Sequence, residues 1–192
     1  MYKRQQWNIP PDRSLVVYLG LLAEYQGTGL LLQAAKHVVS ARPDTHFLIM
    51  GFPNVGEYRG LAERLGLNEH MTFTGQLPYE DAPRYLALGD VAVAPKVSAT
   101  EGCGKLLNYM AMGLPTVAFP TPVSREYLDD LGVYAREISA AALADALLAL
   151  LNDPSEATER GAKLRERAVK KYSWERGSRL IQEVYDNVCS RG

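Results

Sequence analysis

The sequence predicts an α/β protein in which about six strands form a doubly wound, Rossmann-like parallel sheet with helices on both faces. Short apolar runs rich in β-branched residues alternate with segments of helical length and spacing. These runs are apolar throughout instead of at every second position, which is typical of strands buried on both faces. From residue 139 onward the pattern is helical only, so we expect a helical C-terminal segment after the sheet.

The expected strands are short, and a glycine follows each of the first three directly. They lie at residues 15–19, 46–50, 71–74, 91–94, 116–119 and 133–135. Ligands of open α/β sheets bind beyond the carboxyl ends of the strands, which meet at one edge of a parallel sheet. The loops at 20–29, 51–56 and 95–104 are therefore expected to carry the function.

The expected helices have recognisable start and stop signals. Pro43 follows the end of one, Gly66 is the expected C-terminal cap of another, and Ser173 is the expected N-cap of the last. The helices are predicted at 29–41, 57–65, 80–87, 105–113, 140–151, 154–171 and 174–188. Residues 1–13 contain Pro10 and Pro11 and are expected to be the remnant of an interdomain linker.

The composition is that of an ordinary globular domain. Of 192 residues, 47% are hydrophobic and 22% charged, and the net charge of −1 gives no general attraction to nucleic acid. Two cysteines are too few for a disulfide framework, which fits a cytoplasmic location. The basic cluster Lys163, Arg165, Arg167, Lys170 and Lys171 is by default a solvated helix face, and peripheral docking to anionic lipid is the sharper alternative.

The segment 95–115 carries the strongest chemical signal. A buried strand leads into a loop with Gly102 and Gly104, and a helix starts near Lys105. Free backbone N–H groups and the helix dipole make such a helix start an anion site, and an ammonium adds charge to it. Lys105 and Asn108 are three residues apart and share one helix face, which favours ligand binding.

Other residues near these loops keep two interpretations. Lys96 is either a phosphate ligand or an exposed loop residue. Glu101 either contacts a ligand or stabilises the helix N-terminus. Thr28 is either a helix N-cap or a ligand contact. Neither the histidines nor the cysteines have metal-ligand spacing, so no metal and no cofactor are expected.

Several motifs, taken in their order and spacing, are similar to those of a known family. The chain resembles the C-terminal half of the retaining glycosyltransferases of family 4 (group 1), which have the GT-B fold of two Rossmann-like domains. The resemblance runs from residue 9 to about 185. It rests on Tyr18-Leu19-Gly20, Gln26-Gly27, Phe73-Thr74-Gly75, residues 89–95, Glu101-Gly102, residues 110–118 and Tyr172-Ser173-Trp174.

The resemblance implies a donor-binding domain for a nucleotide-diphosphate sugar at residues 14–172 and a C-terminal crossing helix at 173–192. The acceptor-binding N-terminal domain would be missing, and the fragment alone is expected to be inactive. Loop pattern and resemblance together predict a hexosyltransferase-type site. In it Glu101 and Lys105 are catalytic, and Lys96, Gly102, Cys103, Gly104, Asn108, Gly20, Gly27 and Thr28 bind substrate.

The chain departs from the family pattern at several positions. Leu21 and Gln26 stand where many members have an arginine and a lysine that hold the diphosphate. The second of two usual glutamates falls on Asn108, and the first on Thr100, beside Glu101. Lys105 matches a subgroup of the family. Two alternatives follow: a degenerate, non-catalytic GT-B-like binding module, or a domain similar to a nucleotide-sugar epimerase.

Overall fold

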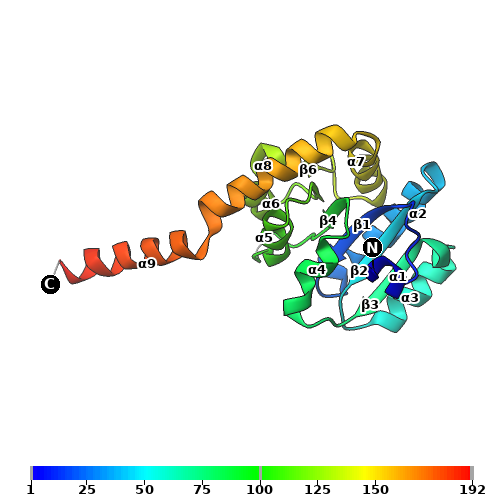
Figure 1. Cartoon of the computed structure of the whole chain (residues 1–192), viewed down its shortest axis with the longest axis horizontal. Coiled ribbons are helices and arrows are strands. Elements are labelled where there is room, and N and C mark those ends of the chain that lie inside the picture. Colours follow the sequence, from blue (N-terminus) through cyan, green and yellow to red (C-terminus); the bar gives the residue numbers. More distant parts are fainter. Residues whose placement is uncertain (1, 100, 191–192) are drawn as a thin grey trace.

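The sheet is parallel throughout, as the sequence predicts. The computed structural model describes residues 2–99 and 101–190, and in them six strands are hydrogen-bonded in the order β3-β2-β1-β4-β5-β6 (Figure 1). Order and direction confirm the doubly wound, Rossmann-like arrangement. The strands are β1 (Ser14–Leu19), β2 (Thr45–Met50), β3 (Met71–Gly75), β4 (Val91–Ala94), β5 (Thr116–Ala118) and β6 (Val133–Tyr134).

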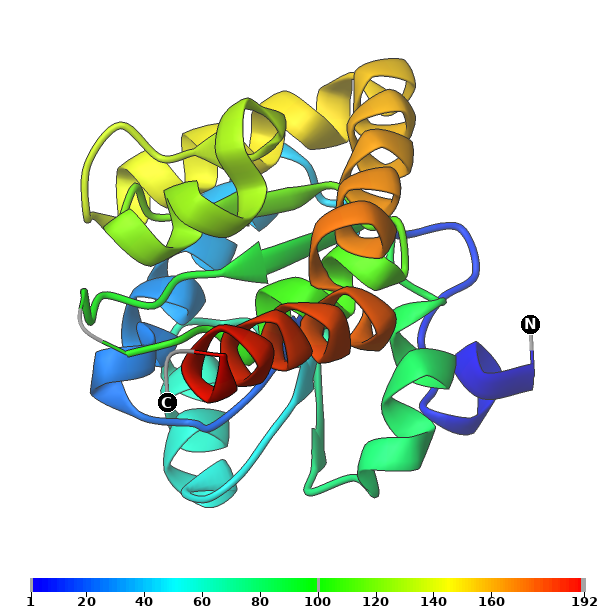
Figure 2. The same cartoon turned by 90° about the vertical axis from the view of Figure 1, so that its left-hand side faces the viewer.

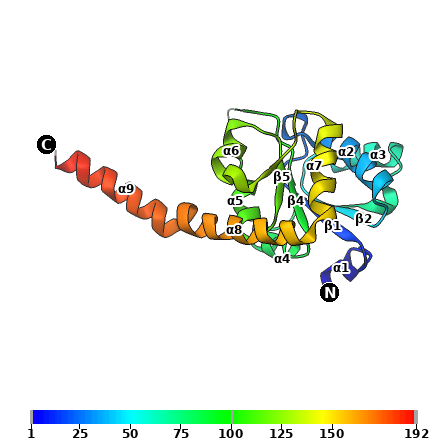
Figure 3. The same ribbon diagram turned by 90° about the horizontal axis from the view of Figure 1, so that it is seen from above.

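Helices cover both faces of the sheet, because successive strand residues point to opposite sides. Val16 and Ile49 pack in one apolar cluster with α2, α3 and α7, whereas Val17 and Leu48 pack in the other with α4, α5, α6 and α8 (Figure 3). The helices are α1 (Tyr2–Gln6), α2 (Thr28–Ala41), α3 (Val55–Arg64), α4 (Ala82–Leu86), α5 (Gly104–Ala111), α6 (Pro122–Leu128), α7 (Ala140–Asn152), α8 (Pro154–Tyr172) and α9 (Trp174–Cys189).

Two helices differ from the sequence-based expectation. Helix α6 was not expected; it begins at Pro122, with the Thr121 hydroxyl accepting a hydrogen bond from the Ser124 N–H at 3.2 Å. The predicted helix at 80–87 is shorter, because a 3₁₀ turn at Tyr79–Asp81 (η3) precedes α4.

The segment 1–13, expected to be a linker, packs against the domain. It contains α1, and Ile9 is buried in the core. The Arg4 guanidinium donates to the Leu88 carbonyl at 2.8 Å and lies 3.5 Å from an Asp90 carboxylate oxygen. The Trp7 ring meets the Tyr85 ring edge-on, with centroids 6.4 Å apart.

Helix α9 projects from the body of the protein (Figures 1 and 3), and Figure 2 views the molecule from the side toward which it points. The Ser173 hydroxyl accepts from the Arg176 N–H at 3.3 Å, which confirms the predicted N-cap. No residue of α9, which the structure describes in full, is buried. Its exposed apolar side chains include Trp174, Ile181, Tyr185 and Val188.

Candidate functional site

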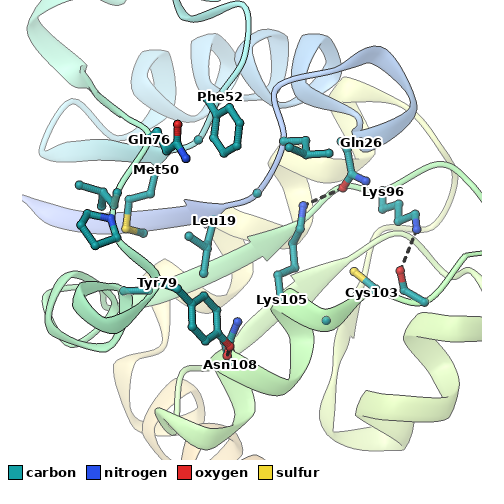
Figure 4. Close-up of a pocket in the computed structure, with 18 residues that line it drawn as sticks. Leu19, Gln26, Met50, Phe52, Gln76, Tyr79, Lys96, Cys103, Lys105 and Asn108 are labelled. Carbon is teal, nitrogen blue, oxygen red and sulfur yellow. Dashed lines mark hydrogen bonds between the residues drawn. The ribbon is translucent and has the colours of Figure 1, made fainter.

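A pocket of about 640 Å³ lies at the carboxyl edge of the sheet, where the loops after β1, β2, β3 and β4 meet the start of α5 (Figure 4). Most of the predicted site residues line it, namely Gly20, Lys96, Gly102, Cys103, Gly104, Lys105 and Asn108. Glu101, Gly27 and Thr28 are not among its lining residues, and Thr100 lies outside the described residues.

Lys105 is the central cation of the pocket. Its side chain rises from the first turn of α5, and Nζ lies 2.8 Å from Gln26 Oε1 (Figure 4). The Tyr18 hydroxyl lies 3.2 Å from the same Nζ. The same Nζ lies 4.3 Å from the centre of the Tyr18 ring, within the range of a cation–π contact. Burial lowers the pKa of Lys105 to about 8; the Cys103 thiol opposes this shift and the Lys96 charge adds to it.

Lys96 is buried, which excludes the interpretation as an exposed loop residue. Its ammonium donates to the carbonyls of Glu101 at 3.0 Å and Gly102 at 2.9 Å, and lies 3.1 Å from Glu101 Oε2. Lys96 therefore holds the chain between β4 and α5 in place. The Glu101 carboxylate is mostly exposed and its observed partner is Lys96.

Gly27 and Thr28 shape the loop after β1. Gly27 has φ +73°, and a Cβ at this position would lie 1.8 Å from the Pro95 carbonyl oxygen, so only glycine fits. The Thr28 hydroxyl donates to the Ala23 carbonyl and accepts from the Ala23 N–H, each at 3.2 Å. Of the two interpretations of Thr28, the N-cap is wrong, because α2 begins at Thr28 itself and Gly27 is its N-cap. The Thr28 hydroxyl instead bonds to the backbone of the preceding loop.

The opposite end of the pocket is apolar and aromatic. Leu19, Met50 and Leu77 line it, and Phe52 and Tyr79 lie on opposite sides of it in Figure 4. The Tyr79 hydroxyl donates to Asn108 Oδ1 at 3.0 Å. The pocket thus has a cationic end at the N-terminus of α5 and an apolar end beside the loops after β2 and β3.

The sequence does not indicate that Gln26, Phe52 and Tyr79 line this pocket, or that Tyr18 contacts Lys105. The resemblance marks Gln26 only as the residue that stands in place of a cation, whereas in the structure its buried amide oxygen accepts from Lys105. The sole signal in the sequence is their position at or beyond strand ends, where ligands bind in such sheets. Nothing in the local pattern indicates which of them contact Lys105.

Cys103 precedes the first residue of α5 and lines the pocket with a buried thiol. Burial raises the pKa of this thiol, although the neighbouring Lys105 and Lys96 charges oppose the shift. Within residues 2–99 and 101–190, no group of three or more His, Cys, Asp or Glu side chains could hold a metal ion. In the same residues, no helix combines the length and apolar character that crossing a bilayer requires.

The family is decided by a match along most of the chain. A family model described as "Glycosyl transferases group 1" matches residues 2–171. The chain belongs to the glycosyl transferases group 1 family. It is 32% identical, over 192 residues, to the phosphatidyl-myo-inositol mannosyltransferase of Mycobacterium tuberculosis, covering 95% of this chain and 50% of that protein. The chain thus spans about half the length of the curated relatives it matches.

Solved structures show the same fold. The C-terminal domain of the glycosyl transferase group 1 protein LpcC from Francisella tularensis is 22% identical, with a TM-score of 0.75, over 89% of this chain and 93% of that one. Anabaena HepE, in complex with UDP and glucose, is 18% identical, with a TM-score of 0.86, over 96% of this chain and 51% of that one. This group 1 chain therefore has the architecture of one half of a GT-B protein.

Two positions at which the sequence departs from the resembled pattern lie in this pocket. Leu21 and Gln26, in the loop after β1, both line it. In this group 1 chain the Lys105 ammonium reaches from α5 to the Gln26 side chain. The positive charge at this end of the pocket thus comes from α5 and not from the loop after β1.

Proposed function

We propose that this chain is the donor-binding part of a retaining glycosyltransferase that takes a sugar from a nucleoside diphosphate sugar. The observation that carries the proposal is the Lys105 ammonium at the N-terminus of α5, inside a pocket whose other end is apolar. The cavity volume, about 640 Å³, suits a ligand of nucleotide size.

The two ends of the pocket give the ligand a direction. The diphosphate lies against Lys105 and the backbone of Gly102 and Gly104, because backbone N–H groups and the dipole of α5 favour negative charge there. The base lies between Phe52 and Tyr79, since aromatic rings offer a stacking surface. Asn108, between the two ends, is placed to hydrogen-bond a ribose hydroxyl as a neutral partner.

The chemical role of the chain in this proposal is to stabilise the leaving group. The bond between the anomeric carbon and the β-phosphate oxygen breaks, and negative charge grows on the nucleoside diphosphate. Lys105 and the N-terminus of α5 stabilise this charge as it develops, which lowers the barrier. The sugar bonds to an acceptor oxygen, whose proton is released.

The acceptor lies outside this chain in the proposal. The chain spans about half the length of its curated relatives, and a wall that excludes water and orients the acceptor is needed for efficient transfer. We therefore expect this chain alone to bind the donor without transferring the sugar. The mycobacterial relative is a phosphatidyl-myo-inositol mannosyltransferase, and the HepE structure is a complex with UDP and glucose. Both support a sugar nucleotide as the donor.

Calorimetric titration with UDP and GDP tests the proposal, with Lys105→Met as the variant and Lys36→Met, on the exposed face of α2, as the matched control. We expect binding of at least one nucleotide. Because no metal is expected at the site, a chelator should not change the affinity. Lys105→Met should weaken it about 10- to 100-fold, because a hydrogen bond to a charged group contributes about 1.5–3 kcal/mol. No binding at millimolar concentration, or equal binding by Lys105→Met, would overturn the proposal.

A binding module without catalysis is the second candidate, and the replacement of both loop cations by Leu21 and Gln26 favours it. The two candidates differ in turnover. Combined with an acceptor-binding half, a donor domain accelerates sugar release from the nucleotide. A binding module leaves the rate of sugar release at that of the uncatalysed reaction in water.

A further inference from the structure

The Lys105 ammonium is held by side chains from two other elements. Tyr18 belongs to β1 and Gln26 to a 3₁₀ turn, Glu24–Gln26 (η1). Gln26 Oε1 accepts from Nζ at 2.8 Å, and the Tyr18 hydroxyl accepts at 3.2 Å while donating to the Leu21 carbonyl at 2.6 Å. The Tyr18 ring also lies below the ammonium, 4.3 Å away.

Gly20 leaves the space through which this lysine passes. A Cβ at position 20 would lie 2.6 Å from Lys105 Nζ and 2.8 Å from Cε. The lysine chain therefore lies directly against the backbone at the end of β1. A side chain that is ordered before binding loses less conformational entropy when it meets a ligand.

We propose that Gln26 and Tyr18 are positioning residues, which fix the Lys105 ammonium toward the pocket and keep its charge available to a phosphate. The proposal rests on the proposed function, because the anion is the diphosphate of the donor. It gives a positioning role to Gln26, which stands where the resembled family usually has a cation.

The neutrality of Gln26 matters to the charge of the pocket. An ammonium has three N–H donors, and among the described residues Gln26 and Tyr18 engage two of them, which leaves the third for an anion. A carboxylate at position 26 would cancel the lysine charge, and a second ammonium would repel it. A glutamine accepts the hydrogen bond and leaves the net charge of the site unchanged.

The other titratable groups near Lys105 are the Tyr18 hydroxyl, the Cys103 thiol and the Lys96 ammonium. Burial raises the pKa of both Tyr18 and Cys103, so these two groups are neutral near pH 7. Lys105 loses its charge as pH rises through about 8. Anion binding should weaken over the same range.

The test uses inorganic pyrophosphate as the probe and Gln26→Glu as the principal variant. The pKa of Lys105 is first measured in the free protein by NMR of its Cε methylene group, and pyrophosphate affinity is then titrated against pH. We expect Gln26→Glu to raise the pH midpoint of Lys105 by about one unit or more. We also expect it to weaken pyrophosphate binding at pH 7 about tenfold or more, because the added carboxylate cancels the charge.

Tyr18→Phe and Gln33→Glu complete the series. Tyr18→Phe keeps the ring and removes one acceptor, so pyrophosphate binding should weaken about threefold to tenfold, as for loss of a neutral hydrogen bond. Gln33→Glu adds the same charge on the exposed face of α2 and should change neither quantity. Thermal unfolding of each variant confirms that it is folded.

The inference is overturned if Gln26→Glu leaves the Lys105 midpoint and pyrophosphate binding unchanged, or if the wild-type chain does not bind pyrophosphate. A chain that binds pyrophosphate through Lys105 but neither UDP nor GDP would support the positioning role. That same result would contradict the proposed function, so the two failures are distinguishable.

Discussion

Lys96 and Glu101 lie at the two ends of one short loop, and their side chains form an ion pair with Nζ 3.1 Å from Oε2. The pair is asymmetric, since the lysine side chain is 6% exposed and the carboxylate 60%. Lys96 also donates to the carbonyls of Glu101 and Gly102, so the buried ammonium closes the loop that delivers Gly102 and Gly104 to the pocket. The loop geometry depends on the lysine far more than on the carboxylate.

Lys96→Met should therefore destabilise the chain and Glu101→Gln should not. The first leaves two carbonyls without their buried donor and should lower the free energy of unfolding by about 1–3 kcal/mol. The second removes the charge of a mostly exposed carboxylate, leaves the carbonyl contacts of Lys96 in place, and should cost less than about 1 kcal/mol. Urea unfolding of both variants measures which substitution lowers the free energy of unfolding more. An equal loss in both would show that the ion pair, and not the carbonyl contacts, holds the loop.

Gly27→Ala should be among the most damaging glycine substitutions. The new Cβ would overlap the Pro95 carbonyl oxygen, 1.8 Å away, and φ is +73°. Gly66→Ala is the matched control, because its φ is +75° and nothing lies within 4 Å of a Cβ there. We expect the control to lose about 1–2 kcal/mol from φ alone and Gly27→Ala to lose clearly more in chemical denaturation. Equal losses would contradict the close approach of the two loops.

His46 should make stability depend on pH. Burial, with the nearby Arg13 and His70 charges adding to it, lowers the pKa of His46 from 6.5 to about 4. The unfolded chain therefore binds more protons between these values, so the free energy of unfolding falls as pH drops from 6.5 toward 4. At about 1.4 kcal/mol per unit the full effect is about 3 kcal/mol.

Urea unfolding across this pH range measures the effect of His46, with His46→Gln as the comparison. The variant keeps a side-chain polar group beside Thr72, whose hydroxyl lies 2.8 Å from His46 Nε2. Its stability should fall less steeply between pH 6.5 and 4. Identical slopes for wild type and variant would assign the pH dependence to other groups.

The apolar side chains of α9 should contribute little to the stability of this chain. Ile181→Ala should change the free energy of unfolding by less than about 0.5 kcal/mol, because the side chain is 60% exposed. Leu164→Ala, at a fully buried position of α8, should cost about 2–5 kcal/mol. A large loss for Ile181→Ala in thermal or urea unfolding would show that α9 folds back onto the domain.

Most of the sheet could be predicted from the sequence, because its buried strands are continuous apolar runs closed by glycines such as Gly20 and Gly51. Helix α6 is missing from the prediction, although Thr121 before Pro122 fits an N-cap followed by a proline in the first helical turn. The packing of α1 does not follow from the local pattern. Pro10 and Pro11 indicate a linker, whereas the contacts of Arg4 with Leu88 and Asp90 are distant in the sequence.

The same distinction applies to the site. A cation at the start of α5 follows from local pattern, because strand, glycine-containing loop and helix are consecutive. Its partners do not, since Gln26 and Tyr18 precede Lys105 by 79 and 87 residues. The local pattern also does not show whether a residue near these loops binds a ligand or stabilises the loop. Lys96 and Thr28 both hydrogen-bond to loop backbone carbonyls and so stabilise the loops.

A crystal structure of the chain soaked with UDP or GDP tests the central claim most directly. We predict a phosphate oxygen within about 3 Å of Lys105 Nζ, with the diphosphate at the N-terminus of α5 and the base toward Phe52 and Tyr79. A nucleotide bound with its phosphates away from Lys105 and from α5 would contradict the account.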